Sequence, residues 1–119
     1  MIAIIRIHGQ IGLKKPVVET LNRLRLRKKY VCRVFENPTA VDLGMIKKVQ
    51  NFVSFGEIDE ATYKELIGKR GKKDKDGNLK PFFRLHPPRG GADTRKHFGV
   101  DKGILGKNKK INELIRRML

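Results

Sequence analysis

The stretch LKPFFRLHPPRGG, Leu79–Gly91, gathers side chains that suit contacts with nucleic acid. Phe82 and Phe83 offer aromatic faces on which bases can stack, at about 1–3 kcal/mol per base. Arg84 and Arg89 offer planar guanidinium groups that match phosphate oxygens and base edges. Because its prolines exclude a helix or a central strand, the segment is predicted to lie extended against a surface outside its own core.

The extended backbone of this stretch also sorts its side chains. Successive residues of an extended segment point to opposite faces, so we expect one of the two phenylalanines to pack in the core and the other to face outward. Pro87 and Pro88 pre-extend the chain, and Gly90 and Gly91 remove side-chain bulk. A segment of this type needs an external mould, which folded RNA provides.

The run RLRLRKK, Arg23–Lys29, is a second cationic feature. Five of its seven residues are cationic: Arg23, Arg25, Arg27, Lys28 and Lys29. The run is predicted to close a helix, whose C-terminal dipole favours cations, but five charges exceed what capping requires. We interpret the run as phosphate-binding, with a solvated helix end as the alternative.

The motif GQIG, Gly9–Gly12, matches the GxxG pattern that clamps a nucleic-acid backbone in one RNA-binding module. In that module the motif joins two helices, whereas here it follows a predicted strand. What remains is that two glycines allow a close approach of backbone to phosphate, beside Lys14 and Lys15. An ordinary strand–helix loop is the alternative.

Enzymatic and metal chemistry have little support. The three histidines, His8, His86 and His97, have no zinc-ligand spacing to one another or to Cys32. The chain also lacks a P-loop and a nucleophile elbow. We therefore predict no catalysis, no cofactor, no metal and no small-molecule substrate. Cys32 is interpreted as a small apolar residue of a strand, and a single cysteine fits the reducing cytoplasm.

The net charge indicates the partner. The 28 Lys and Arg against 12 Asp and Glu give +16, spread as +7 over residues 1–58 (11 − 4) and +9 over residues 59–119 (17 − 8). A compact chain of this charge repels itself unless a polyanion neutralises it, and nucleic acid is the obvious polyanion. No membrane partner is predicted, since the apolar start MIAIIRI is too short for a signal peptide or a spanning helix.

The hydrophobic pattern predicts an α+β fold. Residues 1–58 are predicted as a β-α-β-α-β core with two helices on one face of a small sheet. The expected strands are Ile2–His8, Tyr30–Glu36 and Phe52–Ile58, and the helices begin near Pro16 and at Thr39, with Asp42 completing a capping box.

Residues 59–119 are predicted as a C-terminal extension. It comprises a short helix capped by Asp59, an extended piece over Leu79–Leu85, an irregular basic stretch over residues 86–107, and a terminal helix. The apolar residues of that helix fall at i, i+3, i+4 and i+7: Ile111, Leu114, Ile115 and Met118. The terminal helix is therefore expected to pack back on the sheet.

Several of these segments together carry a family resemblance. RIHGQIG, TLNRLRLRKKYVCRV and PTAVDLGMIKKVQNFVSFGEID resemble the core of the L-thirty family of large-subunit ribosomal proteins. LKPFFRLHPPRGG and KINELIRRML are similar to the long archaeal form of that family. Archaeal members usually carry a longer segment where this chain has only GKKDKDGN, and an arginine is common at the position of His8.

The resemblance implies a ferredoxin-like fold and a structural rRNA-binding protein of the cytoplasmic ribosome, without catalysis, beside other large-subunit proteins. It implies that the Phe-Arg-His-Pro segment lies on rRNA, and that Gly44 either admits a close backbone–sugar contact or has a packing role. The predicted RNA-binding residues are Arg6, His8, Gly9, Gly12, Lys14, Lys15, Arg23, Arg25, Arg27, Lys28, Lys29, Leu43, Gly44, Met45, Lys48, Phe82, Phe83, Arg84, His86, Pro87, Arg89, Gly90, Arg95 and Lys96.

Two other functions stay open at this point. An RNA chaperone or ribosome-assembly factor with the same core would leave the finished particle. A nucleoid DNA-binding protein would prefer duplex DNA and would not need stacking phenylalanines, so Phe82 and Phe83 argue against it.

Overall fold

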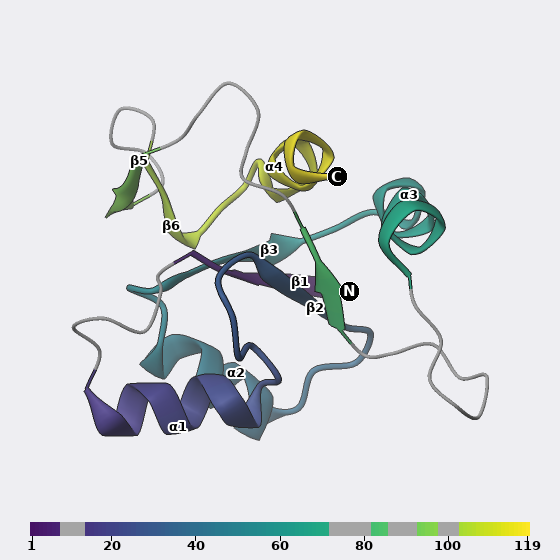
Figure 1. The fold of residues 1–119 in the computed structure, drawn as a ribbon. Helices are drawn as coiled ribbons and strands as arrows, with labels where there is room; N and C mark the ends of the chain where they lie inside the picture. Colours follow the sequence, from purple (N-terminus) through teal and green to yellow (C-terminus); the bar gives the residue numbers. More distant parts are fainter. Residues whose placement is uncertain (8–13, 72–81, 86–92, 98–102) are drawn as a thin grey trace.

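The fold is a single mixed sheet with helices on both faces (Figure 1). The computed structural model describes residues 1–7, 14–71, 82–85, 93–97 and 103–119, with the backbone alone at 93–97, 103 and 104. Within these residues the elements are β1 (Ile2–Arg6), α1 (Lys15–Arg23), β2 (Val31–Phe35), α2 (Ala40–Lys48), β3 (Val53–Glu57), α3 (Glu60–Arg70), β4 (Phe82–Arg84), β5 (Asp93–His97), β6 (Gly103–Lys107) and α4 (Ile111–Met118).

The strand order is β4-β2-β1-β3-β6-β5. β1 lies between β2 and β3 and is antiparallel to both, β4 is antiparallel to β2, and β6 is parallel to both β3 and β5. The predicted β-α-β-α-β core and the α+β class are confirmed. The first four residues of β1, IAII, form a continuous apolar run because both faces of the strand are covered.

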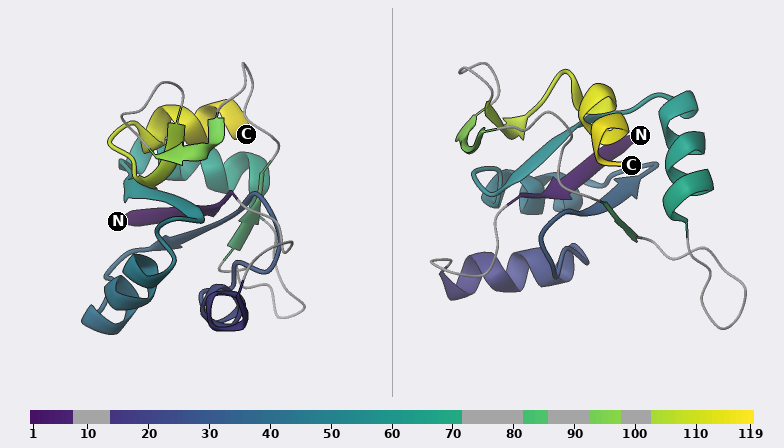
Figure 2. Two further views of the ribbon diagram at one scale, coloured as in Figure 1. Left: turned by 90° about the vertical axis from the view of Figure 1, so that its left-hand side faces the viewer. Right: turned by 45° about the horizontal axis from the view of Figure 1, so that its top comes forward.

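The helices divide between the two faces of the sheet. α1 and α2 cover one face, and α3 and α4 cover the other (Figures 1 and 2). The side chains of β1 alternate accordingly, since Ile4 packs in the cluster of α1 and α2 while Ala3 and Ile5 pack in the cluster of α3 and α4. The result is three layers with a core on each side of the sheet.

The predicted caps of α2 and α3 are confirmed. The Asp42 amide donates to Thr39 Oγ1 at 3.2 Å, and the Thr39 amide donates to Asp42 Oδ2 at 3.1 Å, which completes the capping box. The Asp59 carboxylate accepts from the Thr62 amide at 2.7 Å. Hydrogen bonding with Thr62, through its side chain first and its amide second, lowers the pKa of Asp59. Both caps satisfy amides that a helix start leaves without partners.

The terminal helix also forms as predicted. α4 buries all four residues of its apolar stripe: Ile111, Leu114, Ile115 and Met118. It packs beside α3, where Arg116 Nε lies 3.3 Å from Glu65 Oε2. The stripe closes one face of the sheet, so this part of the extension belongs to the same core as β1.

The prediction of an irregular stretch over residues 86–107 is wrong for two parts of it. β5 and β6 lie within that stretch, and β6 continues the sheet beside β3. β6 pairs with a strand far away in the sequence, and its own sequence, GILGK, contains two glycines. No local pattern therefore predicted this strand. At this edge the Asn108 amide donates to the Phe55 carbonyl at 2.7 Å, and a Cβ on Gly56 would collide with the Asn108 carbonyl oxygen.

Candidate nucleic-acid interface

Only Arg23 of the cationic run lies in α1, and residues 24–29 form a loop after the helix. α1 ends at Arg23, and Arg25 takes a left-handed backbone with φ of 65°. Leu24 and Leu26 are fully buried, whereas the cations of the run are all exposed. The predicted position in the helix is therefore wrong, because the leucines turn inward at alternate positions. The interpretation of the run as phosphate-binding stays a prediction.

The buried Arg6, at the end of β1, holds this loop by hydrogen bonds. The Arg6 side chain is fully buried, and its Nη1 donates to the Leu26 carbonyl at 2.8 Å. The Tyr30 amide donates to the Arg6 carbonyl at 2.6 Å, so β1 holds the loop at two points. Burial lowers the pKa of Arg6 from its ordinary value. The prediction that Arg6 contacts RNA does not agree with the structure, because its side chain is fully buried.

The two adjacent phenylalanines of β4 face opposite sides of the sheet, as predicted. Phe83 lies opposite Cys32 and is 2% exposed in the core beneath α3 and α4. Phe82 lies opposite Arg33 and is half-buried on the side of α1 and α2. The earlier inclusion of Phe83 among RNA-binding residues is therefore wrong, since its ring is not accessible. Phe82 lines the pocket described next.

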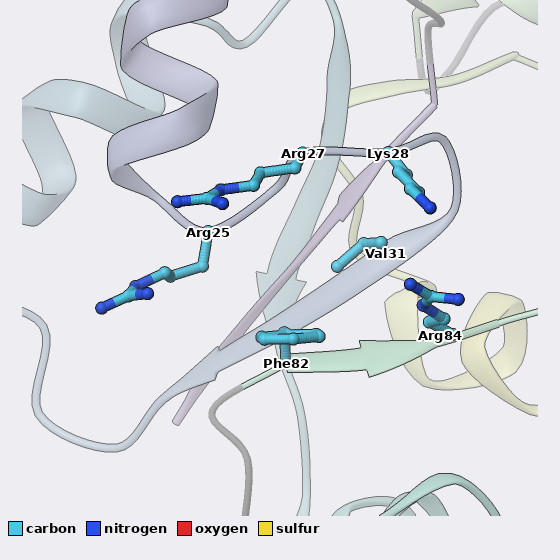
Figure 3. Close-up of a pocket in the computed structure, with 6 residues that line it drawn as sticks. All are labelled: Arg25, Arg27, Lys28, Val31, Phe82 and Arg84. Atoms are coloured by element: carbon cyan, nitrogen blue, oxygen red, sulfur yellow. The ribbon is translucent and has the colours of Figure 1, made fainter. Parts of the chain in front are cut away.

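A pocket of about 300 Å³ lies between β4 and the cationic loop. Its lining residues are Arg25, Arg27, Lys28, Val31, Phe82 and Arg84. Figure 3 shows Phe82 and Arg84 on β4 facing the loop, with Val31 between them and the Lys28 and Arg84 side chains reaching toward each other. None of the described residues that line this pocket is acidic. The arrangement suits a ligand with an apolar ring and negative charge.

Arg33 lies on β2 next to the residues that line this pocket, and the sequence analysis did not include it. It lies opposite Phe82 on β2, and its guanidinium carbon is 4.3 Å from the centroid of the Phe35 ring. Burial is the main cause that lowers the pKa of Arg33; Asp42 raises it and Arg25 lowers it. Strand alternation was the available signal, because it places Val31, Arg33 and Phe35 on one face.

α2 presents exposed apolar side chains in its first half and exposed cations at its end. Val41 is 71% exposed and Leu43 is 46% exposed, and Gly44 is exposed beside them. A Cβ on Gly44 would meet nothing within 4 Å, so the structure gives this glycine no packing role. Met45 is half-buried in the core and Lys48 is exposed.

Leu43 borders a second hollow, of about 530 Å³, between α2 and the edge formed by β3 and β6. Lys107 and Lys109 also line it. Glu57 lines the same hollow, so its lining carries charges of both signs.

The remaining predicted residues divide into two groups. Lys14 and Lys15, at the start of α1, are exposed. The others fall outside what the structure describes: His8, Gly9, Gly12, His86, Pro87, Arg89 and Gly90 lie outside the described residues, and Arg95 and Lys96 lie in β5, where only the backbone is described.

Other chemistries find no site in the described part of the chain. No group of three or more His, Cys, Asp or Glu side chains there could hold a metal ion. Cys32 is fully buried, and burial raises the pKa of its thiol to about 12, so it stays protonated near neutral pH. None of the described helices has the length and apolar character needed to span a membrane.

Comparison with known proteins assigns the family. The family model for ribosomal protein L30p/L7e matches residues 2–53, from β1 to the start of β3. The large ribosomal subunit protein uL30 of Methanosphaera stadtmanae is 32% identical over 154 residues, covering all of both chains. This chain belongs to the uL30 family of large-subunit ribosomal proteins.

Other archaeal relatives agree with this assignment. The uL30 protein of Methanococcus vannielii is 33% identical over 153 residues, covering 98% of both chains. That of Pyrobaculum aerophilum is 33% identical over 166 residues, covering 98% of this chain and 93% of the relative. The 154 positions aligned with the Methanosphaera protein exceed the 119 residues here by 35 (154 − 119), so this uL30 chain is the shorter of the two. The difference is consistent with the short join GKKDKDGN.

Proposed function

We propose that this uL30 family member is a structural constituent of the large ribosomal subunit that binds and stabilises folded rRNA, without catalysis, on cytoplasmic ribosomes. Its partners are large-subunit rRNA and neighbouring ribosomal proteins. The observation that carries the proposal is the anchored cationic loop after α1, whose exposed cations lie beside Phe82 and Arg84. The archaeal relatives, which are named as large ribosomal subunit proteins, support the same assignment.

The loop suits RNA because its cations are held in place before binding. Leu24 and Leu26 are fully buried, and the Leu26 carbonyl accepts from Arg6. A fixed loop loses less conformational entropy on binding than a free chain, so more of the electrostatic attraction appears as affinity. The net charge of +16 supplies long-range attraction to any RNA surface.

α2 adds a contact of another kind. Val41 and Leu43 are exposed, and Gly44 beside them has no side chain. This part of the helix surface is therefore apolar and protrudes little at Gly44. The minor groove of A-form RNA is wide and shallow and presents ribose groups. A helix with Gly44 exposed can bring its backbone close to such a groove, so we assign Leu43, Gly44, Met45 and Lys48 to the RNA footprint.

The first test is sedimentation of native lysate through a sucrose gradient at high salt, with this chain followed by antibody. A structural constituent stays with the large subunit at about one copy per particle. If the chain is found only with precursor particles, an assembly factor replaces the proposal. If it sediments with neither, the rRNA-binding proposal fails.

The second test measures salt dependence of binding to large-subunit rRNA. The logarithm of affinity should fall with the logarithm of salt concentration, with a slope of about 0.7–0.9 per phosphate contact. The double variant Arg27→Gln/Lys28→Gln should reduce that slope. The matched control Lys64→Gln/Lys69→Gln removes two exposed charges from α3 and should change it less. Equal effects of the two double variants would remove the loop from the interface.

A further inference from the structure

The pocket beneath the cationic loop is too small for an RNA helix but fits a single ring system. Its volume of about 300 Å³ lies at the lower end of small-ligand sites. Its apolar surface is supplied by Val31 and Phe82, and its rim carries Arg25, Arg27 and Arg84, with Lys28 beside them. A small inorganic anion would leave the apolar surface without a contact, and an apolar ligand would leave the four cations without a counter-charge.

A nucleotide uses both parts. Its base stacks on an aromatic side chain, and its two flanking phosphates pair with guanidinium and ammonium groups. Phe82 and Arg84 are two residues apart on β4, so their side chains lie on the same face of the strand. An aromatic ring and a guanidinium group are thereby placed side by side. Their partners across the strand pair are Arg33 and Val31, so the floor of the pocket belongs to the sheet.

The walls of the pocket are fixed in advance. Arg25 and Tyr30, at the two ends of the loop, both have φ of 65° although neither is glycine. Such residues persist where the surrounding structure holds them, and they gather at functional sites. Here the Tyr30 amide bonds to the Arg6 carbonyl, and the Tyr30 carbonyl accepts from the Leu85 amide at 3.0 Å. The loop is thereby tied to β1 and to the segment that follows Phe82.

We propose that this pocket receives the base of one unpaired rRNA nucleotide, stacked on Phe82, with the flanking phosphates held by Arg25, Arg27, Lys28 and Arg84. The inference rests on the proposed rRNA-binding function and adds the class of ligand at this position. The base is unpaired because a base inside an A-form helix is stacked on its neighbours and cannot enter a pocket. A bulge or a loop of the rRNA supplies it.

The experiment combines cross-linking with one matched pair of variants. Purified native large subunits are irradiated at short ultraviolet wavelength, and nucleotide adducts are mapped by mass spectrometry on the protein and by primer extension on the rRNA. We expect an adduct on Phe82 and a stop at a nucleotide that chemical probing shows as unpaired. Adducts elsewhere in the chain but none near Phe82, or a stop within a helix, would overturn the proposal.

Binding of purified variants to large-subunit rRNA gives an independent readout. Phe82→Leu keeps an apolar side chain but removes the aromatic face, and should weaken binding about 5- to 150-fold, as loss of one stacked base predicts. The slope of the salt dependence should stay unchanged, because no phosphate contact is lost. The control is Phe55→Leu, another half-buried phenylalanine in the same core cluster, which should leave affinity close to that of the wild type.

The outcomes separate the two proposals. Wild-type protein that neither binds rRNA nor sediments with large subunits would contradict the proposed function itself. Wild-type binding that Phe82→Leu leaves unchanged would contradict the nucleotide pocket alone. A melting temperature measured for each free variant shows whether any loss of affinity comes from unfolding.

Discussion

The two faces of the sheet use apolar residues differently. On one face α4 buries all four residues of its apolar stripe and closes the core with α3. On the other face α2 buries Ile46, while Val41 and Leu43 stay exposed. The face of α3 and α4, called the closed face below, is completed by the chain itself, whereas on the face of α1 and α2, called the open face, apolar and cationic side chains stay exposed.

The largest expected effect tests the closed face at β4. Phe83→Ala should lower the free energy of unfolding by about 3–5 kcal/mol, because it empties a fully packed site in the core beneath α3 and α4. Phe82→Ala should cost less, since that ring is half-buried on the open face. Urea denaturation of both free variants measures the difference. Equal losses would mean that the two faces are equally closed at this strand.

The next prediction compares the two helices directly. Ile115→Ala in α4 should cost about 2–5 kcal/mol, as for other fully buried aliphatic residues. Leu43→Ala in α2 should change stability by about 0.5 kcal/mol, but should weaken incorporation into large subunits. Urea denaturation gives the first quantity, and competition with wild-type protein during subunit reconstitution gives the second. If Leu43→Ala competes as well as the wild type, α2 is not part of the interface.

Local sequence patterns predicted one helix on each face of the sheet. α4 was predicted from the helical spacing of its apolar residues: Ile111, Leu114, Ile115 and Met118. The start of α2 was predicted from the capping residues Thr39 and Asp42. Such local patterns report which face of an element turns inward. β6 was missed because its parallel partner β3 lies some fifty residues earlier in the chain.

The candidate site was predicted in part, for a related reason. The exposed cations after Arg23 could be read from composition, and strand alternation placed one phenylalanine of β4 inward. The burial of Arg6 could not be read, because its partner is a backbone carbonyl in a loop twenty residues away. Alternation alone also leaves open which phenylalanine faces inward; that choice depends on the register of β4 against β2.

A smaller effect is expected from two exposed helical glycines. A Cβ on Gly44 in α2 or on Gly68 in α3 would meet nothing within 4 Å. Gly44→Ala and Gly68→Ala should therefore each stabilise the free protein by about 0.5–1 kcal/mol, because alanine loses less backbone entropy in a helix. Gly44→Ala should nevertheless weaken rRNA binding, and Gly68→Ala should not.

Comparing Gly44→Ala with Gly68→Ala separates the effect of helix propensity from the effect of a contact with RNA. Thermal denaturation of the free proteins should show the same rise for both, so any difference in rRNA affinity arises at the surface of α2. If both variants bind like the wild type, Gly44 makes no close approach to RNA.

The smallest expected effect concerns the ion pair across the closed face. Arg116 and Glu65 join α4 to α3, but their side chains are 46% and 49% exposed. An exposed pair is screened by water and salt and loses side-chain entropy on forming, so Glu65→Gln should change stability by about 0.5 kcal/mol or less. Glu113→Gln, at another exposed glutamate of α4, is the matched control in the same urea denaturation. A loss above about 1 kcal/mol for Glu65→Gln alone would show that charge as well as apolar burial holds α4 in place, and the contrast between the two faces would then be one of pairing rather than of packing.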